Sequence, residues 1–202
     1  MKIGIISGSH RSPSQSEKVA NYMSGCLIDE GVKTWVYPLA KNPLPLWDQS
    51  IWEGEKAWSE RLQPVKNELS ECDGFIIISP EWHGQVPSGL KNFFLFFGHA
   101  EFGHKPALLV SVSSGDGGAY PIAELRMSSY KNNRICYLPE HLILRKVEKI
   151  LNEDPNDNDE SLDSYYRERI NWTLGILKGY TTALKPMRDT TQIFHDKFGY
   201  GM

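Results

Sequence analysis

The stretch Gly74-Phe75-Ile76-Ile77-Ile78-Ser79 contains an unbroken apolar run, and it decides the fold class of this 202-residue chain. Such a run is typical of a strand that is buried on both faces, because a strand with one face in water alternates apolar and polar residues. Both faces of a sheet are covered when helices connect parallel strands. The run therefore predicts an α/β protein built on a parallel sheet.

Similar apolar runs recur along the chain and alternate with helical patterns. Strands are predicted at residues 2–7, 32–37, 74–79, 107–112 and 134–138. Helices are predicted between them at residues 17–29, 57–69, 88–97 and 122–131. Right-handed crossovers turn this alternation into a doubly wound sheet with helices on both faces. No linker or internal repeat interrupts the pattern, so we expect a single domain over residues 1–202.

A C-terminal extension, residues 141–202, follows this core of about residues 1–140. Residues 153–163 contain six acidic and no basic side chains, and residues 165–184 carry a long helical pattern that we expect Pro186 to end. The acidic run is typical of a solvated segment that precedes the positive end of a helix. Calcium binding is the alternative interpretation, but the EF-hand spacing around a central glycine is missing.

Composition and charge exclude several classes of protein. With 40% hydrophobic and 23% charged residues the chain is not a disordered tail, and a net charge of -3 leaves no basic face for nucleic acid. No apolar run is long enough to span a bilayer, and the apolar start at residues 1–6 is too short for a signal-peptide core, so we expect a cytoplasmic domain without a membrane partner. Cys26, Cys72 and Cys136 lack metal or disulfide spacing and are predicted to be buried thiols in a reducing compartment.

Ligands of doubly wound sheets bind where the strands end at their carboxyl edge. Three loops are therefore expected to form the site: residues 8–16, 80–87 and 113–120. The first loop carries four serines and Arg11 between a strand and a helix. Hydroxyls, a guanidinium and the N–H groups at a helix start suit a phosphate dianion. The alternative is an ordinary serine-rich helix cap.

The other two loops are rich in features that suit a flat ligand. In the second loop, the Trp82 ring and several backbone amides would lie beside a planar ligand. The alternative is that Trp82 fills core space and His83 is an ordinary surface side chain. The third loop, residues 113–120, contains three glycines, which permit close backbone approach or a plain turn.

Taken together, the three loops resemble the NADPH-dependent FMN reductase family of flavodoxin-like proteins over residues 1 to about 140. The resemblance rests on Gly8-Ser9-x-Arg11-x-x-Ser14-x-Ser16, on Pro80-Glu81-Trp82-His83-Gly84 with Val86-Pro87 and Leu90-Lys91-Asn92, and on Ser113 with Gly117-Gly118; Pro45-Leu46-Trp47-Asp48 and Leu125-Arg126 also fit. It implies a flavodoxin-like sheet of five strands in the order 2-1-3-4-5.

The resemblance also implies a set of FMN-binding residues and no catalytic side chain or metal, since the hydride chemistry belongs to the flavin. The phosphate is expected at Ser9, Arg11, Ser14 and Ser16, the ring and ribityl chain at Pro80, Glu81, Trp82, His83 and Gly84, and the other side of the ring at Ser113, Ser114, Gly115, Gly117 and Gly118. The family commonly has Tyr-Asn at Trp82-His83 and Asn at Ser16. His83 would add a titratable donor beside the flavin.

The implied activity is an NAD(P)H-dependent reduction of bound FMN, which then reduces a flavin, a quinone or a similar small acceptor. Candidates for recognition of the nicotinamide phosphate are Arg126, Lys91 and His10. The family also implies a homodimer or homotetramer through the phenylalanine-rich helix 88–97.

Two other functions remain open from the sequence. One is a flavodoxin-type FMN electron carrier, which a net charge of only -3 argues against, because such carriers are strongly acidic. The other is a phosphate-ligand or phosphotransfer domain that would use Asp116, although no attacking group is apparent beside it.

Overall fold

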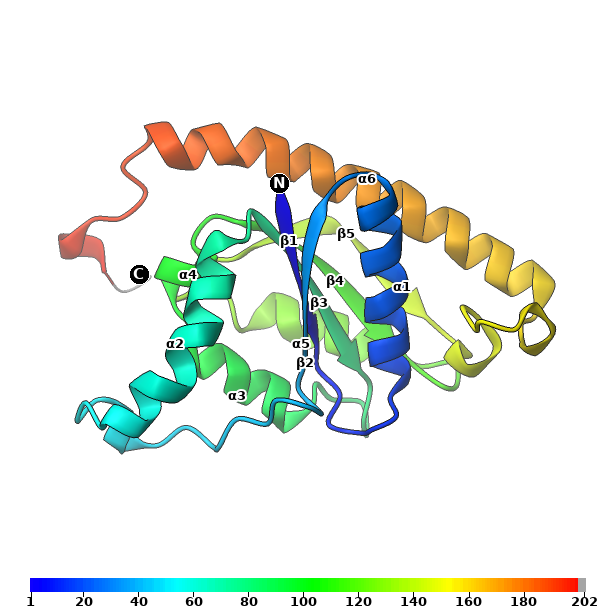
Figure 1. Ribbon diagram of the computed structural model, residues 1–202, viewed down its shortest axis with the longest axis horizontal. Coiled ribbons are helices and arrows are strands. Elements are labelled where there is room, and N and C mark those ends of the chain that lie inside the picture. Colours follow the sequence, from blue (N-terminus) through cyan, green and yellow to red (C-terminus); the bar gives the residue numbers. More distant parts are fainter. Residues whose placement is uncertain (200–202) are drawn as a thin grey trace.

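Five parallel strands in the order β2-β1-β3-β4-β5 form the centre of the computed structural model, which describes residues 1–199 (Figure 1). The strands are β1 (Lys2–Ser7), β2 (Lys33–Pro38), β3 (Gly74–Pro80), β4 (Pro106–Val112) and β5 (Cys136–Leu144). The predicted strand order and the parallel pairing are confirmed. The order reverses direction between β1 and β3, which creates the expected switch point at the carboxyl edge.

Helices cover both faces of the sheet (Figure 1). One face packs against α1 (Gln15–Asp29) and α6 (Glu160–Thr190). The other packs against α2 (Lys56–Glu71), α3 (Ser88–Phe96), α4 (His99–Phe102) and α5 (Ala119–Met127). Short 3-10 turns lie at Gln49–Ile51, Val147–Lys149, Pro155–Asp157 and Asp196–Phe198. Within the described residues, no helix is both long and apolar enough to cross a membrane.

The apolar run in β3 serves both layers of helices. Ile76 and Ile78 belong to the cluster under α1 and α6, whereas Phe75 and Ile77 belong to the cluster on the opposite face. All four side chains are fully buried. Because successive side chains of a strand point to opposite faces, a strand covered on both sides can be apolar at consecutive positions. The interpretation of this run as a central strand is confirmed.

The fifth strand extends well beyond the predicted residues 134–138. It runs to Leu144 and contains an irregularity, because Tyr137 pairs with Ala107 and His141 pairs with Leu109. The β5 side therefore carries extra residues, which leave carbonyl groups without a ladder partner. Arg126 supplies a hydrogen-bond donor for two of these carbonyl groups, because its Nη2 donates to the oxygens of Leu138 at 2.6 Å and Pro139 at 3.0 Å. The preceding helix, α5, ends at Met127 rather than at residue 131.

The long C-terminal helix was predicted too short at both ends. It begins at Glu160, with the Asp159 carboxylate accepting from the N–H of Leu162 at 2.9 Å, and it continues through Pro186 to Thr190. Acidic residues thus occupy the positive start of α6, as the solvated-segment interpretation expected. Over residues 1–199, no group of His, Cys, Asp and Glu side chains has the arrangement of a metal site.

The three cysteines are free thiols, but they are not all buried. Cys72 is fully buried, and burial raises its pKa to about 12. Cys26 on α1 and Cys136 at the start of β5 are only partly buried. The expectation of three buried thiols was therefore wrong for two of them.

Candidate functional site

A cavity of about 590 Å³ lies where β1, β3 and β4 end. Its volume is in the range of small-molecule sites, roughly 300–1,000 Å³. All three predicted loops contribute to it. The predicted residues that line it are Ser9, Arg11, Ser14, Ser16, Pro80, Glu81, Trp82, Ser113, Ser114 and Gly115. The predicted convergence of residues far apart in sequence is therefore present in the fold.

The first loop brings the start of α1 to the cavity. Ser14 is the N-cap of this helix, and its hydroxyl oxygen accepts from the N–H of Glu17 at 3.0 Å. The first N–H groups of a helix have no partner within the helix, and they carry the positive end of its dipole. The Ser9 hydroxyl accepts from the Arg11 N–H at 3.2 Å, while the Arg11 side chain stays exposed. The start of α1, the serine hydroxyls and the Arg11 residue thus all border the same cavity.

One buried acceptor on this wall has no protein partner. The Oε1 atom of Gln15 is inaccessible to solvent and makes no hydrogen bond within the described structure. Gln15 itself lines the cavity. A buried polar atom without a partner costs free energy, so a donor from a ligand or a water molecule is required there.

The second loop is a tight hairpin. Trp82 and Gln85 form an antiparallel bridge, with the Trp82 N–H donating to the Gln85 carbonyl at 3.2 Å and the Gln85 N–H donating back at 2.9 Å. His83 and Gly84 between them have φ angles of 51° and 70°. Positive φ at both central residues is the signature of a type I′ turn. The turn leaves Trp82 half-buried in the cavity wall and puts His83 at the exposed tip, outside the cavity lining.

The third loop divides into two parts. Ser113, Ser114 and Gly115 line the cavity, whereas Gly117 and Gly118 lie at the junction with α5. Gly118 is the N-cap of α5 and has a φ of 105°. Of the predicted site residues, His83, Gly84, Gly117 and Gly118 thus surround the cavity without lining it.

The cavity wall also includes three residues that were not predicted from the sequence: Lys18 on α1, and Val147 and Glu148 of the C-terminal extension. The Lys18 ammonium donates to three oxygens at 2.8 Å each: the carbonyls of Val147 and Ile150 and the side chain of Asn152. Burial lowers the pKa of Lys18. Lys18 lies one helical turn after Ser14, a spacing that could have placed it on the same face of α1. No local pattern marks Val147 or Glu148.

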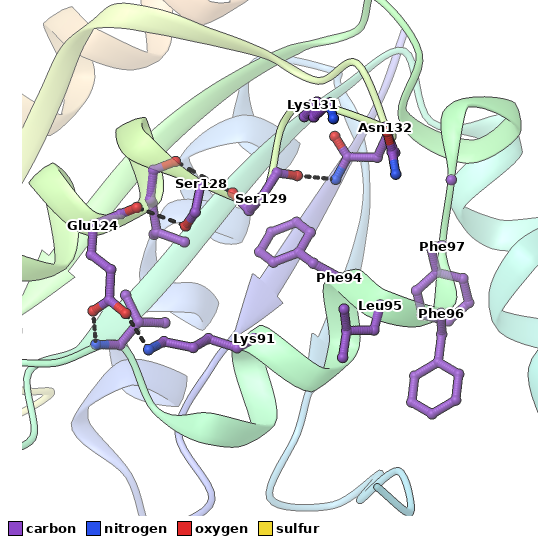
Figure 2. A pocket seen from close by; sticks show the side chains of 14 residues that line it. Lys91, Phe94, Leu95, Phe96, Phe97, Glu124, Ser128, Ser129, Lys131 and Asn132 are labelled. Carbon is purple, nitrogen blue, oxygen red and sulfur yellow. Dashed lines mark hydrogen bonds and ion pairs between the residues drawn. The ribbon is translucent and has the colours of Figure 1, made fainter. Parts of the chain in front are cut away.

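A second cavity of about 550 Å³ lies between α3, α5 and residues 128–133 (Figure 2). Figure 2 shows aromatic and aliphatic side chains of α3 along one side and polar side chains along the other. Lys91 forms an ion pair with Glu124, whose carboxylate also accepts from the Val86 N–H at 2.8 Å. The Lys91 ammonium and the Glu124 carboxylate are therefore both paired within the protein.

The three candidates for nicotinamide phosphate recognition thus have different surroundings. Arg126 binds the carbonyls of the β5 irregularity and Lys91 pairs with Glu124. His10 lies beside the cavity, with its ring centroid 6.2 Å from that of Trp82. Of these side chains, only His10 lies next to a residue of the cavity wall through a contact that the structure records.

Comparison with known proteins gives a consistent family assignment. Residues 1–149 match the model of a family described as NADPH-dependent FMN reductase. An NADPH azoreductase from Bacillus sp. strain OY1-2 is 30% identical over 146 residues, which cover 71% of this chain and 76% of that protein. A 2-hydroxy-1,4-benzoquinone reductase from a Burkholderia species is 25% identical over 81% of this chain and 88% of that protein.

Solved structures share the fold at low sequence identity. A flavoenzyme NAD(P)H:(acceptor) oxidoreductase from Paracoccus denitrificans is 16% identical, with a TM-score of 0.63 over 92% of this chain and 97% of that one. An NADH:FMN oxidoreductase crystallised in its apo form is 13% identical, with a TM-score of 0.64 over 91% of this chain and 90% of that one.

Proposed function

The chain belongs to the NADPH-dependent FMN reductase family, and from this premise we propose that it binds FMN in the three-loop cavity and reduces it with NAD(P)H. Bound FMN would accept hydride from NAD(P)H and pass electrons to a small acceptor such as a flavin, a quinone or an azo compound. The observation that carries the proposal is the convergence of the three family motifs on one cavity at the switch point of the sheet.

The first-loop wall fits the phosphate end of FMN. Ser9, Ser14 and Ser16 supply hydroxyls, Arg11 supplies a guanidinium, and the start of α1 supplies N–H groups and a positive dipole. The unpartnered Oε1 of Gln15 supports a polyhydroxylated ligand, because a ribityl hydroxyl is a donor of the kind that this atom lacks. We assign phosphate recognition to this wall.

The other two loops fit the flavin ring. Pro80, Glu81 and Trp82 line the cavity on one side, and Ser113, Ser114 and Gly115 line it on the other. His83 and Gly84 would shape the hairpin that presents Trp82, while Gly117 and Gly118 would shape the third loop. In this assignment the four surrounding residues act through the backbone conformation of their loops.

The whole chain is proposed to act as one domain over residues 1–202, in the cytoplasm, where its free thiols stay reduced. We further infer that it forms a homodimer or homotetramer through α3. Leu95 on this helix is 64% exposed, and the aromatic side chains beside it line the second cavity. A second copy of the chain would remove this apolar surface from water.

The first experiment is a titration of the purified protein with FMN while tryptophan fluorescence is monitored, followed by NADPH without oxygen. We expect quenching at micromolar FMN and then rapid bleaching of the flavin. Trp82→Phe should lose much of the quenching, whereas Trp172→Phe, on half-exposed α6 surface, should retain it. Quenching without bleaching would favour the electron-carrier function. No binding of FMN would refute the proposal.

A further inference from the structure

We propose that Glu81 and Arg145 are positioning residues of the three-loop site that hold one peptide group of the third loop from its two ends. This inference rests on the proposed function for its consequence on flavin binding. The geometry itself is independent of that function. Arg145 belongs to the C-terminal extension, so the proposal also gives that extension a role at the site.

The peptide group in question joins Gly117 to Gly118. Its carbonyl oxygen accepts from the Nε of Arg145 at 2.9 Å, and its N–H donates to the Oε2 atom of Glu81. The C=O and N–H of a trans peptide lie in one plane and point in opposite directions. A peptide between two glycines is otherwise unusually free to rotate. The two side chains therefore define its orientation.

The close approach of Glu81 explains the small residue at position 117. A Cβ atom added to Gly117 would lie 2.7 Å from the Glu81 Oε2 and 3.1 Å from its Cδ. At a contact under 3.0 Å one of the two groups must shift, and the atom met here is the end of a flexible side chain, so a larger residue would displace the carboxylate. Gly118 meets a separate constraint, because its φ of 105° disfavours any L side chain. The carboxylate and the Gly117 backbone therefore form one packed unit.

Both residues are anchored in the fold through their backbones. The Glu81 N–H donates to the carbonyl of Val112 at 3.0 Å, which continues the pairing of β3 with β4. The Arg145 N–H donates to the phenolic oxygen of Tyr166 on α6 at 3.1 Å. Glu81 thus holds the peptide from the sheet, and Arg145 holds it from the extension.

The same extension contacts the cavity-lining part of the third loop. The N–H of Lys146 donates to the Gly115 carbonyl at 3.1 Å, and the N–H of Val147 donates to the Ser113 carbonyl at 3.2 Å. Fixing the Gly117–Gly118 peptide therefore fixes the end of a loop whose other end is already bound. We infer that the clamp holds residues 113–115 in the conformation that forms the cavity wall.

The charges of the clamp match the local dipoles. The Glu81 carboxylate lies at the positive N-terminal end of α5, a helix whose N-cap is a glycine without a side chain to cap it. The Glu81 carboxylate is thus engaged by a backbone N–H group of the protein itself. The assignment of Glu81 changes accordingly, from a flavin contact to a support for the loop that flanks the flavin.

The test measures amide exchange of residues 113–118 in the flavin-free protein, together with the affinities for FMN and riboflavin. Glu81→Ala and Arg145→Met should each accelerate exchange of this loop by about tenfold and weaken both flavins alike by about five- to tenfold. The double variant should be little worse than either single variant, because the two side chains hold one group. Glu124→Ala is the matched control, since it removes another carboxylate that binds a loop N–H and should leave exchange at 113–118 unchanged.

A second variant tests the steric part of the clamp. Gly117→Ala should accelerate exchange as Glu81→Ala does, and it should add almost nothing in the Glu81→Ala background, where the obstructing carboxylate is gone. Weaker flavin binding with unchanged exchange would overturn the proposal and make Glu81 a direct contact. A loss in Arg145→Met confined to FMN would instead indicate a phosphate contact. If the natural protein binds neither flavin, the proposed function fails, while the exchange data still decide the clamp.

Discussion

Arg11 contributes a positive charge to the first loop at the mouth of the cavity. If it pairs with the FMN phosphate, Arg11→Ala should weaken FMN binding by on the order of 1.5–3 kcal/mol, which is roughly 10- to 150-fold in affinity. Riboflavin, which has no phosphate, should bind almost as before. Fluorescence titration of the two ligands gives the comparison directly.

The control for this prediction is Arg61→Ala, which removes an exposed arginine from α2, away from the cavity-lining residues. This variant should bind both ligands normally. Equal weakening of FMN and riboflavin by Arg11→Ala would mean that the phosphate lies elsewhere.

The turn residue His83 has its backbone in the left-handed region, with a φ of 51°. An L residue there costs roughly 1–2 kcal/mol, and glycine removes that cost but adds about 0.5–1 kcal/mol of unfolded-state entropy. His83→Gly should therefore raise the free energy of unfolding by about 0.5 kcal/mol. Its exposed position predicts an unchanged pH profile of turnover. Chemical denaturation and a pH–rate series check the two parts.

At Gly84, the next residue of the turn, a substitution should change the free energy of unfolding in the opposite direction. Gly84 has a φ of 70°, so Gly84→Ala should lower the free energy of unfolding by about 1 kcal/mol. A pH profile that changes in His83→Gly would instead show that the imidazole reaches the reacting groups, as the sequence alone had suggested.

At the scale of elements, α6 continues through Pro186 because its last turns are bound to the amino-terminal edge of the sheet. Lys185 Nζ lies 3.1 Å from the Asp73 carboxylate, and Arg188 donates to the Asp73 and His104 carbonyls at 3.4 and 3.3 Å. The N–H of Lys2 donates to the same carboxylate at 2.9 Å. These contacts offset the hydrogen bond that proline cannot make.

Asp73→Asn should test this attachment. Burial alone would raise the pKa of Asp73, but the Lys2 N–H and the charge of Lys185 outweigh it and lower the pKa. The ionised form is therefore stabilised by folding, fully above the ordinary value near 3.8, and this contribution is lost as pH falls through the lowered folded pKa. The variant should lose about 1–2 kcal/mol at pH 7 and little at pH 2.

Thermal and urea unfolding across this pH range measure the effect. Glu71→Gln is the control, because Glu71 forms an exposed ion pair with Lys2 and should change stability much less. A deficit in Asp73→Asn that stays constant down to pH 2 would contradict an electrostatic attachment.

At the scale of the whole molecule, the proposed oligomer predicts that the exposed face of α3 is covered in solution. Leu95→Glu places a charge on that face and should shift the protein toward monomers in sedimentation at micromolar concentration. Ile28→Glu is the control, since Ile28 is 57% exposed on α1 at the other face of the sheet. A natural protein that sediments as a monomer would refute the oligomer.

The central sheet and the position of the three-loop cavity follow from local patterns in the sequence. Apolar runs such as residues 75–78 contain no polar residue because both faces are buried, and that property is local. Parallel strands bring their carboxyl ends to one edge, so the loops after β1, β3 and β4 had to meet. The residues of those loops could therefore be named before any side chain was placed.

Which polar groups are already paired depends on tertiary packing. The sequence does not distinguish a charged side chain that is paired within the protein from one that is free to bind a ligand. In the fold, Arg126 donates to a strand carbonyl, Lys91 pairs with Glu124, and Glu81 accepts from the Gly118 N–H. The persistence of α6 beyond Pro186 and the wall formed by Val147 have the same origin. Local patterns encode burial and conformation, whereas the partner of a polar group depends on which distant segments packing brings within hydrogen-bond distance.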